Sequence, residues 1–368
     1  MNLTIQREAL LEPLQLVIGV VERRQTMPIL ANVLLTVEDD VLSVTATDLE
    51  IELIGRSRLE APVKEPMQIT ISGRKLLDIC RTLPEKVQID LSQDKERLIV
   101  RSGRSRFILA TMPVENFPAF EEGQTNLEFS VEQKHFNNLL QRTHFAMAQQ
   151  DVRYYLNGML FELKEGKMRT VATDGHRFAM TSIATPLAGQ EKTQVIMPRK
   201  GVMELLRLLK NEASEVVAVV GENHLRVRGE AFTFTSKLID GRFPDYERVL
   251  PKTTGKFVAV DRDALREALM RVAILSNEKV RAVRLQLRSN LLHILANNPE
   301  QEEAEEVLTV DYDGEDMEIA FNVTYLLDVL NTVNTGEIKL TFLDANSRMF
   351  MEEANNEDSL FLIMPLQI

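Results

Sequence analysis

The stretch QVIMPRKGVMELLRLLKNEASEVVAVVGENHLRVRGEAFTFTSKLIDGRFPDY, residues 194–246, contains two hydrophobic periods, one after the other. Apolar residues first recur at the i, i+3, i+4, i+7 spacing, at Val202, Leu205, Leu206 and Leu209. This spacing predicts a helix with one apolar face. From 216 to 234 the period changes to two, with Gly-Glu pairs between the apolar runs. Alternation with such breaks predicts three strands linked by hairpins.

The same pattern occurs in two other parts of the chain. Residues 68–118 carry it 125 positions earlier, with Arg74-Lys75 matching Arg199-Lys200 and Asn116-Phe117-Pro118 matching Arg242-Phe243-Pro244. Residues 318–368 carry it again and end in Met-Pro-Leu-Gln-Ile. Copies of about 120 residues have the usual size of a domain. We therefore predict three domains, at 1–122, 128–247 and 248–368.

Each copy contains a second amphipathic helix ahead of its own strands. Six helices are therefore predicted, at 7–20, 73–82, 131–148, 199–210, 261–275 and 322–334. Antiparallel strands with two such helices per copy indicate the α+β class, in which the helices pack on one face of a sheet.

Composition is typical of a globular protein, with 44% hydrophobic and 27% charged residues. No secretory leader is recognisable, and no apolar run approaches the roughly 18 residues that span a bilayer. We therefore expect a cytoplasmic protein without a membrane partner. The single cysteine, Cys80, lies among Leu and Ile in a predicted helix, so no intramolecular disulfide is possible and a buried, inert thiol is expected.

The net charge of −12 at first argues against a nucleic-acid partner. The predicted helices, however, hold 13 basic and 9 acidic residues. Mildly basic helices on an acidic body are expected if one helical surface faces phosphate. The alternative is that Arg and Lys are simply good helix formers on solvated faces.

Opposite charge runs lie near the two ends of the repeat array. Residues 298–306 hold five carboxylates, and the first copy has a basic run at Lys95, Arg97, Arg101, Arg104 and Arg106. Such runs are usually solvated faces. At the ends of an array they also fit a head-to-tail contact that closes a ring. Two chains supply twelve helices, which at a spacing of about 9 Å would line a hole of roughly 25 Å, wide enough for duplex DNA.

Several longer motifs occur in a characteristic order. They are DVRYYLNGMLFE at 151–162, TVATDGHR at 170–177, PRKG at 198–201, DGRFPDY at 240–246, AILSNEK at 273–279 and NNPEQEEAEE at 297–306. Through them the chain resembles the bacterial sliding clamps, the beta subunits of DNA polymerase III, over essentially its whole length. The resemblance implies the DNA clamp fold, in which a head-to-tail homodimeric ring with helices inside and sheets outside encircles duplex DNA. It also implies a non-catalytic processivity factor that tethers the polymerase alpha subunit, the clamp loader, other polymerases and repair proteins through a short peptide motif.

The resemblance further implies three groups of site residues. The peptide pocket comprises Leu156, Thr173, Gly175, His176, Arg177, Phe178, Pro244, Arg248, Val249, Asn322, Tyr325, Met364, Pro365 and Leu366. DNA contacts are carried over to Arg24, Gln150, Tyr154, Tyr155, Arg199 and Lys200. The dimer interface is expected at Lys75, Arg104, Arg106, Phe107, Ile274, Leu275, Glu300, Glu303 and Glu306. The chain departs from the family at Phe178, where Leu is common, at Gln25, where Pro is frequent, and at its carboxy terminus.

An enzyme is the first alternative. Asp174, His176 and Ser182 could form a hydrolytic site, and Asp48, Glu50 and Glu52 a metal site. We interpret Asp174-Gly175 as a turn and Asp48, Glu50 and Glu52 as one solvated strand face, and neither a phosphate-binding loop nor a His-Glu-x-x-His pair is present. No catalytic residue, metal or cofactor is therefore expected. A repeat scaffold that binds only proteins is the second alternative.

Overall fold

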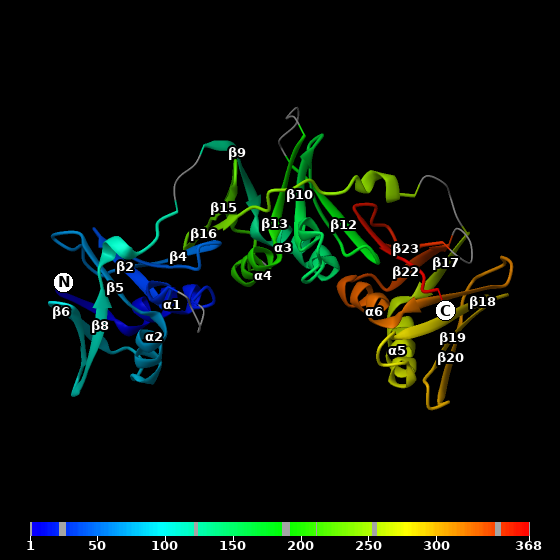
Figure 1. Cartoon of the computed structure of the whole chain (residues 1–368), viewed down its shortest axis with the longest axis horizontal. Helices are drawn as coiled ribbons and strands as arrows, with labels where there is room; N and C mark the ends of the chain where they lie inside the picture. The colour runs from blue at the N-terminus through cyan, green and yellow to red at the C-terminus, as the bar shows by residue number, and fades with distance from the viewer. Residues whose placement is uncertain are drawn as a thin grey trace. The chain divides into compact units, whose positions relative to one another are not determined.

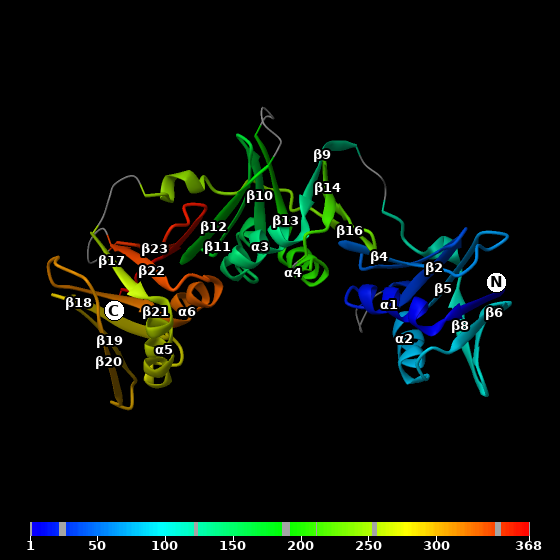
Figure 2. The same ribbon diagram turned by 180° about the vertical axis from the view of Figure 1, so that it is seen from behind.

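The computed structural model describes residues 2–21, 27–120, 124–185, 192–210, 212–251, 256–342 and 347–367. The chain divides into two compact units. The first unit contains Met1–Lys134 and Met203–Leu238, and the second contains His135–Val202 and Ile239–Ile368. Figures 1 and 2 show both from opposite sides.

The first unit is built on one antiparallel sheet of twelve strands, in the order β1-β6-β7-β8-β5-β2-β3-β4-β16-β15-β14-β9. Its strands are β1 (Asn2–Gln6), β2 (Asn32–Glu38), β3 (Val41–Thr47), β4 (Ile51–Arg58), β5 (Met67–Ser72), β6 (Gln88–Asp94), β7 (Arg97–Ser102), β8 (Ser105–Met112), β9 (Thr125–Glu132), β14 (Glu215–Gly221), β15 (His224–Arg228) and β16 (Phe232–Lys237). Helix α1 (Arg7–Val17) packs on β3 and β4, and α2 (Gly73–Thr82) packs on β2 and β5. The two helices lie side by side, as Figure 1 shows.

The second unit contains two antiparallel sheets. Eight strands are ordered β13-β10-β11-β12-β24-β23-β22-β17, and four are ordered β20-β19-β18-β21. Their bounds are β10 (Gly158–Lys164), β11 (Lys167–Thr173), β12 (Arg177–Ala184), β13 (Thr193–Pro198), β17 (Lys256–Asp261), β18 (Ala282–Arg288), β19 (Leu291–Asn297), β20 (Glu303–Thr309), β21 (Met317–Asn322), β22 (Glu337–Phe342), β23 (Met349–Glu353) and β24 (Ser359–Ile363). Helices α5 (Arg262–Val272) and α6 (Val323–Thr332) contact each other, and α5 packs on β19 and β20.

The remaining helices are α3 (Gln133–Thr143) and α4 (Arg199–Leu208), and two of the three boundaries between the units fall within them. All six predicted helices are therefore present in the described parts of the chain, and the α+β class is confirmed. The predicted helix at 131 begins two residues later, because β9 continues to Glu132. Single 3-10 turns, His144–Ala146 and Ala273–Leu275, follow α3 and α5, as is common at helix ends.

A proline inside α1 has a specific partner on the sheet. Pro13 lacks an N–H and cannot bond the carbonyl of Ala9 four residues earlier. The Ser57 hydroxyl of β4 donates to that carbonyl at 2.5 Å instead. Gly55 lies beneath the proline, where a Cβ atom would come within 2.9 Å of the Pro13 carbonyl oxygen. The helix thus packs closely on the sheet without an orphaned acceptor.

The expected apolar face of α4 needs one correction. Leu206 is only half-buried, while Leu208 is buried. Cys80 is buried in α2 as expected, and burial raises the pKa of its thiol to about 12. Among the described residues, no helix combines the length and apolarity needed to cross a membrane.

Candidate functional site

The turn between β11 and β12 is held by its own side chains. Asp174 Oδ1 accepts the backbone N–H groups of His176 at 2.8 Å and Arg177 at 2.9 Å. Thr173 Oγ1 accepts the N–H of Gly175 at 3.1 Å. Gly175 has φ of +89°, and a Cβ there would approach the Arg153 guanidinium at 3.2 Å, so glycine suits this position. This arrangement confirms the interpretation of Asp174 and Gly175 as a turn.

Arg177 connects that turn to α6. Its Nε donates to Asp174 Oδ2 at 3.1 Å, and its Nη1 forms an ion pair with Asp328 of α6. The guanidinium carbon lies 4.4 Å from the ring centroid of Tyr325, also on α6. Ion pairing and cation–π stacking together fix the side chain. Arg177 therefore positions the turn, which leaves little of its charge for a ligand.

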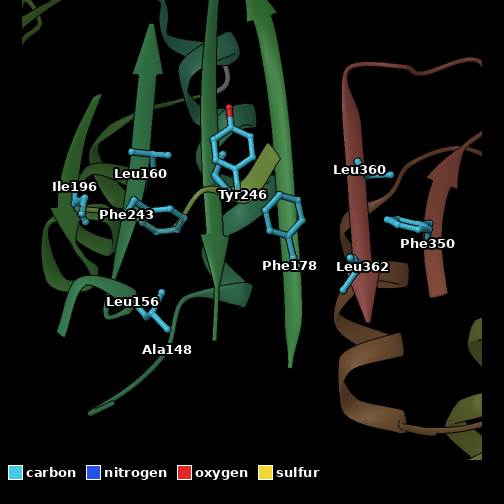
Figure 3. Close-up of a cluster of buried hydrophobic side chains, with 11 residues drawn as sticks. Ala148, Leu156, Leu160, Phe178, Ile196, Phe243, Tyr246, Phe350, Leu360 and Leu362 are labelled. Atoms are coloured by element: carbon cyan, nitrogen blue, oxygen red, sulfur yellow. The ribbon is translucent and has the colours of Figure 1, made fainter. Parts of the chain in front are cut away.

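An apolar cluster lies beside this turn in the second unit (Figure 3). Its buried members are Ala148, Leu156, Leu160, Val171, Phe178, Ile196, Phe243, Tyr246, Phe350, Leu360 and Leu362. Phe178 of β12 pairs with Leu362 of β24. Its ring stacks on Tyr246 with centroids 6.2 Å apart, and Figure 3 shows the two rings adjacent. The partly buried side chains of Met180, Val249 and Leu250 pack on the cluster, where apolar groups of a ligand could be received.

The carboxy-terminal segment passes from the eight-stranded sheet to β21 of the four-stranded sheet. The N–H of Met364 donates to the carbonyl of His176 at 2.8 Å, and that of Leu366 donates to Ala320 at 2.8 Å. Met364 is 41% exposed. Pro365 and Leu366 are half-buried. The structure thus brings the turn at 173–178 together with residues 364–366.

The other expected pocket residues have separate roles. Asn322 caps α6 by accepting the N–H of Thr324 at 2.9 Å. Arg248 is 82% exposed and pairs with Asp245 at 2.9 Å. Pro244 is exposed, between the buried Phe243 and Tyr246. Sequence reasoning missed Met180, Leu160 and Leu360 in this region. Met180 follows Phe178 by two positions along its strand, so it could have been expected on the same face of the sheet.

The buried carboxylate of Glu162 holds one member of the cluster, Tyr246, in place. Glu162 of β10 accepts hydrogen bonds from Tyr246 Oη at 2.5 Å and Gln194 Nε2 at 2.7 Å, and Lys192 lies 3.2 Å away. Burial opposes the charge, but these partners leave the pKa of Glu162 below its usual value. Burial and the bond to Glu162 raise the pKa of Tyr246. The hydroxyl therefore remains protonated at neutral pH and holds the ring against Phe178.

The loop from 149 to 155 places two expected DNA contacts at the surface. Gln150 is exposed with φ of +55°. Tyr154 is 56% exposed, whereas Tyr155 packs against the apolar cluster. Asp151 organises the loop by accepting hydrogen bonds from Arg153, which lower its pKa to about 2.

The other expected DNA contacts differ in exposure. Lys200 is exposed in the first turn of α4. Arg199 is half-buried, and its Nη1 donates to the carbonyls of His144 and Met147 at 3.4 Å. Burial lowers the pKa of Arg199. Its guanidinium is thus directed at the end of α3. Arg24 lies outside the described residues.

Two sheet edges carry four of the expected interface residues, Arg106, Phe107, Glu303 and Glu306. Strand β8 pairs with β5 only through Thr70 and Ile71 of β5. Residues 105–110 of β8 therefore pair with a strand on one side, β7, and their other edge is open. Strand β20 is the last strand of its sheet. Such edges can pair with another chain.

The expected interface side chains, which lie on these edges, in the adjoining turns, on α2 and after α5, are complementary in charge and partly apolar. Lys75, Arg104 and Arg106 are exposed in the first unit, with Phe107 half-buried. In the second unit Ile274 is 78% exposed. Glu300 and Glu303 are exposed, and Leu275 and Glu306 are half-buried. Glu306 accepts from Arg271 Nε at 2.6 Å, which lowers its pKa, so part of its charge is already compensated.

The interpretation of Asp48, Glu50 and Glu52 as one solvated strand face is wrong. Asp48 and Glu50 belong to the turn before β4, where Asp48 Oδ1 accepts the N–H of Glu50 at 2.9 Å. Glu52 is only 8% exposed, and burial raises its pKa. For the alternative hydrolytic set, Ser182 Oγ donates to Asp358 at 3.1 Å. Within the ranges that the structure describes, no cluster of three or more His, Cys, Asp or Glu residues could hold a metal ion.

Comparisons with known proteins cover the whole chain. Family models of the DNA polymerase III beta subunit match residues 1–121 (N-terminal domain), 130–245 (central domain) and 247–367 (C-terminal domain). A beta sliding clamp of Pseudomonas putida is 55% identical over 368 residues, with both chains fully covered. The crystal structure of the DNA polymerase III subunit beta from Pseudomonas aeruginosa matches with a TM-score of 0.97 at 55% identity, again over 100% of both chains. A sliding clamp of the same organism bound to griselimycin is 56% identical, with a TM-score of 0.96 and full coverage of both chains.

Proposed function

The chain belongs to the DNA polymerase III beta subunit family, and we propose that it acts as a sliding clamp in DNA replication. Two copies close head to tail into a ring around duplex DNA, with helices inside and sheets outside. The ring tethers the replicative polymerase to its template. Three domains, at 1–122, 128–247 and 248–368, make up each half of the ring.

The pair of open sheet edges is the observation that carries this proposal. Strand β8 has an exposed basic end and a 44% exposed Ile108, and β20 has an exposed Glu303 and a 46% exposed Val307. Pairing β8 of one copy with β20 of another would satisfy both edges and match their charges. Because the two edges differ, this contact is heterologous and closes after two copies if the rotation allows it.

The apolar cluster supports a peptide-binding role. Val249, Leu250 and Met180 are partly buried against the cluster, and the exposed Met364 follows its member Leu362 by two residues, so aliphatic and aromatic anchors of a short peptide have apolar partners. The exposed His176 and Arg248 offer polar contacts at its margin. The polymerase alpha subunit, the clamp loader, other polymerases and repair proteins would share this site. A related clamp binds griselimycin, and the same compound should compete for it.

DNA contact in this proposal is weak and independent of sequence, because a clamp must slide. Exposed Gln150, Tyr154 and Lys200 are the groups best placed to meet the backbone, together with Arg24. Tyr155 and Arg199 would act mainly by supporting them, given their packing. The chain has no catalytic role in this scheme.

Processive synthesis tests the proposal. A DNA polymerase III core from a related bacterium would extend a primed circle with clamp loader and ATP, with and without this protein. We expect products from a single binding event to lengthen only when the protein is present. Unchanged product length would refute tethering, and the scaffold that binds only proteins would then be preferred.

A further inference from the structure

The first unit has a pocket with a volume of about 290 Å³ next to the β3–β4 turn. Its apolar side includes Leu49, Pro118 and Phe120, and its polar side includes Asn223, His224 and Lys237. His224 is 6% exposed, and burial lowers its pKa, so it is neutral at pH 7. Lys237 is exposed, with its Nζ 5.7 Å from the ring centroid of Phe120. Lys237 is thus the positive group among the residues that line the pocket.

The pocket has the same main-chain frame as the proposed peptide site of the second unit. Strand β4 pairs with β16 and β12 pairs with β24, in each case antiparallel. The N–H of Lys237 donates to the carbonyl of Glu50 at 2.8 Å, just as that of Met364 donates to His176 at 2.8 Å. Lys237 and Met364 are therefore counterparts.

The turns beside them are also equivalent. Asp48 Oδ1 accepts the N–H of Ile51 at 2.7 Å, as Asp174 Oδ1 accepts that of Arg177 at 2.9 Å. The hydroxyl of Thr47 donates to the carbonyl of Ile51 at 2.8 Å. Thr173 does the same to Arg177 at 2.6 Å. The repeat has thus preserved the geometry of the peptide site in the first unit.

The side chains on that frame differ in polarity. Phe178 and Leu362 are paired residues of β12 and β24. At the equivalent positions of β4 and β16 the paired residues are Glu52 and Thr235. Glu52 accepts a backbone hydrogen bond from Phe120, and Arg226 Nε donates to Thr235 Oγ1 at 3.2 Å. Each of these two buried polar side chains thus has a hydrogen-bond donor. The floor is therefore unsuited to the two apolar anchors that the second unit can receive.

We propose that this pocket binds a short acidic peptide of a partner protein, with a carboxylate at Lys237 and the adjacent aliphatic side chain against Leu49, Pro118 and Phe120. An ammonium–carboxylate hydrogen bond supplies the selectivity, and the volume suits one or two side chains. The inference rests on the proposed function in one respect, that the frame shared with the second unit binds peptides.

Disulfide exchange at a cysteine placed on the pocket rim tests this site. Ala119 is exposed and lines the pocket, so the Ala119→Cys substitution places a thiol there. The native Cys80 is buried and its thiol pKa is about 12, so Cys80 does not compete in the exchange. Two blocked peptides, Cys-Gly-Leu-Asp and Cys-Gly-Leu-Asn, are supplied as mixed disulfides with 2-mercaptoethanol and compete at a fixed concentration of free 2-mercaptoethanol. The protein thiolate attacks the peptide sulfur and releases 2-mercaptoethanol, and intact mass gives the captured fractions. We expect about tenfold preference for the acidic peptide, the usual worth of a charge-assisted hydrogen bond.

Further substitutions on the same Ala119→Cys background locate the selectivity. Lys237→Met installs the residue of the second unit and should abolish the preference, whereas Lys237→Arg should retain it. Lys64→Met, at another exposed lysine, removes the same charge elsewhere and should change nothing. Equal capture of the two peptides, or a preference that survives Lys237→Met, would overturn the proposal. Neither result would affect processive synthesis by the unmodified chain, so the two proposals fail separately.

Discussion

At the scale of single residues, Met364 offers a direct test of the peptide site. Met364→Lys places the counterpart residue of the first unit next to the apolar cluster. We expect peptide affinity to fall about tenfold, because burying a methionine side chain contributes roughly 1.5–3 kcal/mol and an ammonium group cannot replace it. Fluorescence polarisation with a labelled clamp-binding peptide measures the change. Met203→Lys is the matched control, since Met203 of α4 is 42% exposed compared with 41% for Met364, and it should bind as the unmodified chain does.

Tyr246 predicts how stability depends on alkaline pH. Its pKa is raised above the unfolded value of about 10 by burial and by its bond to Glu162. A raised pKa stabilises the fold fully below pH of about 10, and this contribution is lost as pH rises towards the folded pKa, by up to about 1.4 kcal/mol per pH unit. Tyr246→Phe cannot ionise. Urea unfolding at about pH 8 and about pH 11 should therefore give a smaller stability loss for the variant, and equal losses would contradict the assignment.

Local pattern predicted side chains well where spacing alone decides their environment, since Val202 and Leu205 of the expected apolar face are both buried. Phe178 and Leu156 were placed in the peptide site by the resemblance, and the structure shows both in the apolar cluster. Glu52 was expected on a solvated face but is buried, because β4 lies in the middle of the sheet and pairs with the distant β16. The exposure of a strand residue depends on such partners, which its own alternation does not reveal. The hydrogen bond from Arg199 to the carbonyl of His144 could not be predicted from the sequence either, because the two residues are far apart along the chain.

At the scale of elements, the open edges of β8 and β20 predict the effect of charge reversal. Arg104→Glu with Arg106→Glu makes β8 acidic opposite an acidic β20, so dimer dissociation should increase at least about tenfold. The reciprocal variant, Glu300→Lys with Glu303→Lys, should dissociate similarly. Analytical ultracentrifugation measures both. An oligomer as stable as that of the unmodified chain would contradict this pairing of edges.

Mixing the two variants provides an internal control. In a head-to-tail dimer with one copy of each, one contact joins the two reversed edges and the other joins the two native edges. Both contacts are then complementary in charge. The mixture should form a heterodimer with nearly the affinity of the unmodified dimer. If the substitutions instead weakened each chain on its own, both variants would stay monomeric in the mixture.

Helices were easier to predict than sheets for a physical reason. Amphipathic spacing is local, and all six helices begin within two residues of their predicted positions. Sheet continuity is not local. The pairs β4–β16 and β12–β24 join strands of successive family domains, so the compact units of the chain do not coincide with its repeats. The hairpins that link β14, β15 and β16 were nevertheless predicted, because their turns are short.

At the scale of the whole molecule, the family membership of the chain and its two complementary sheet edges lead to one central claim. The protein holds DNA by surrounding it, and we propose that its side chains contact the duplex only weakly. Weak contacts through exposed Lys200 and Tyr154 should decline with salt, while a closed ring remains linked to a DNA without ends.

Retention on DNA tests that claim most directly. The protein is loaded with a clamp loader and ATP onto a nicked circle, and half of the sample is then linearised with a restriction enzyme. We predict long-lived retention on the circle, even in high salt, and rapid loss from the linear form through its ends. Equal retention on the two forms would mean that the protein binds by surface contact, and the ring would have to be abandoned.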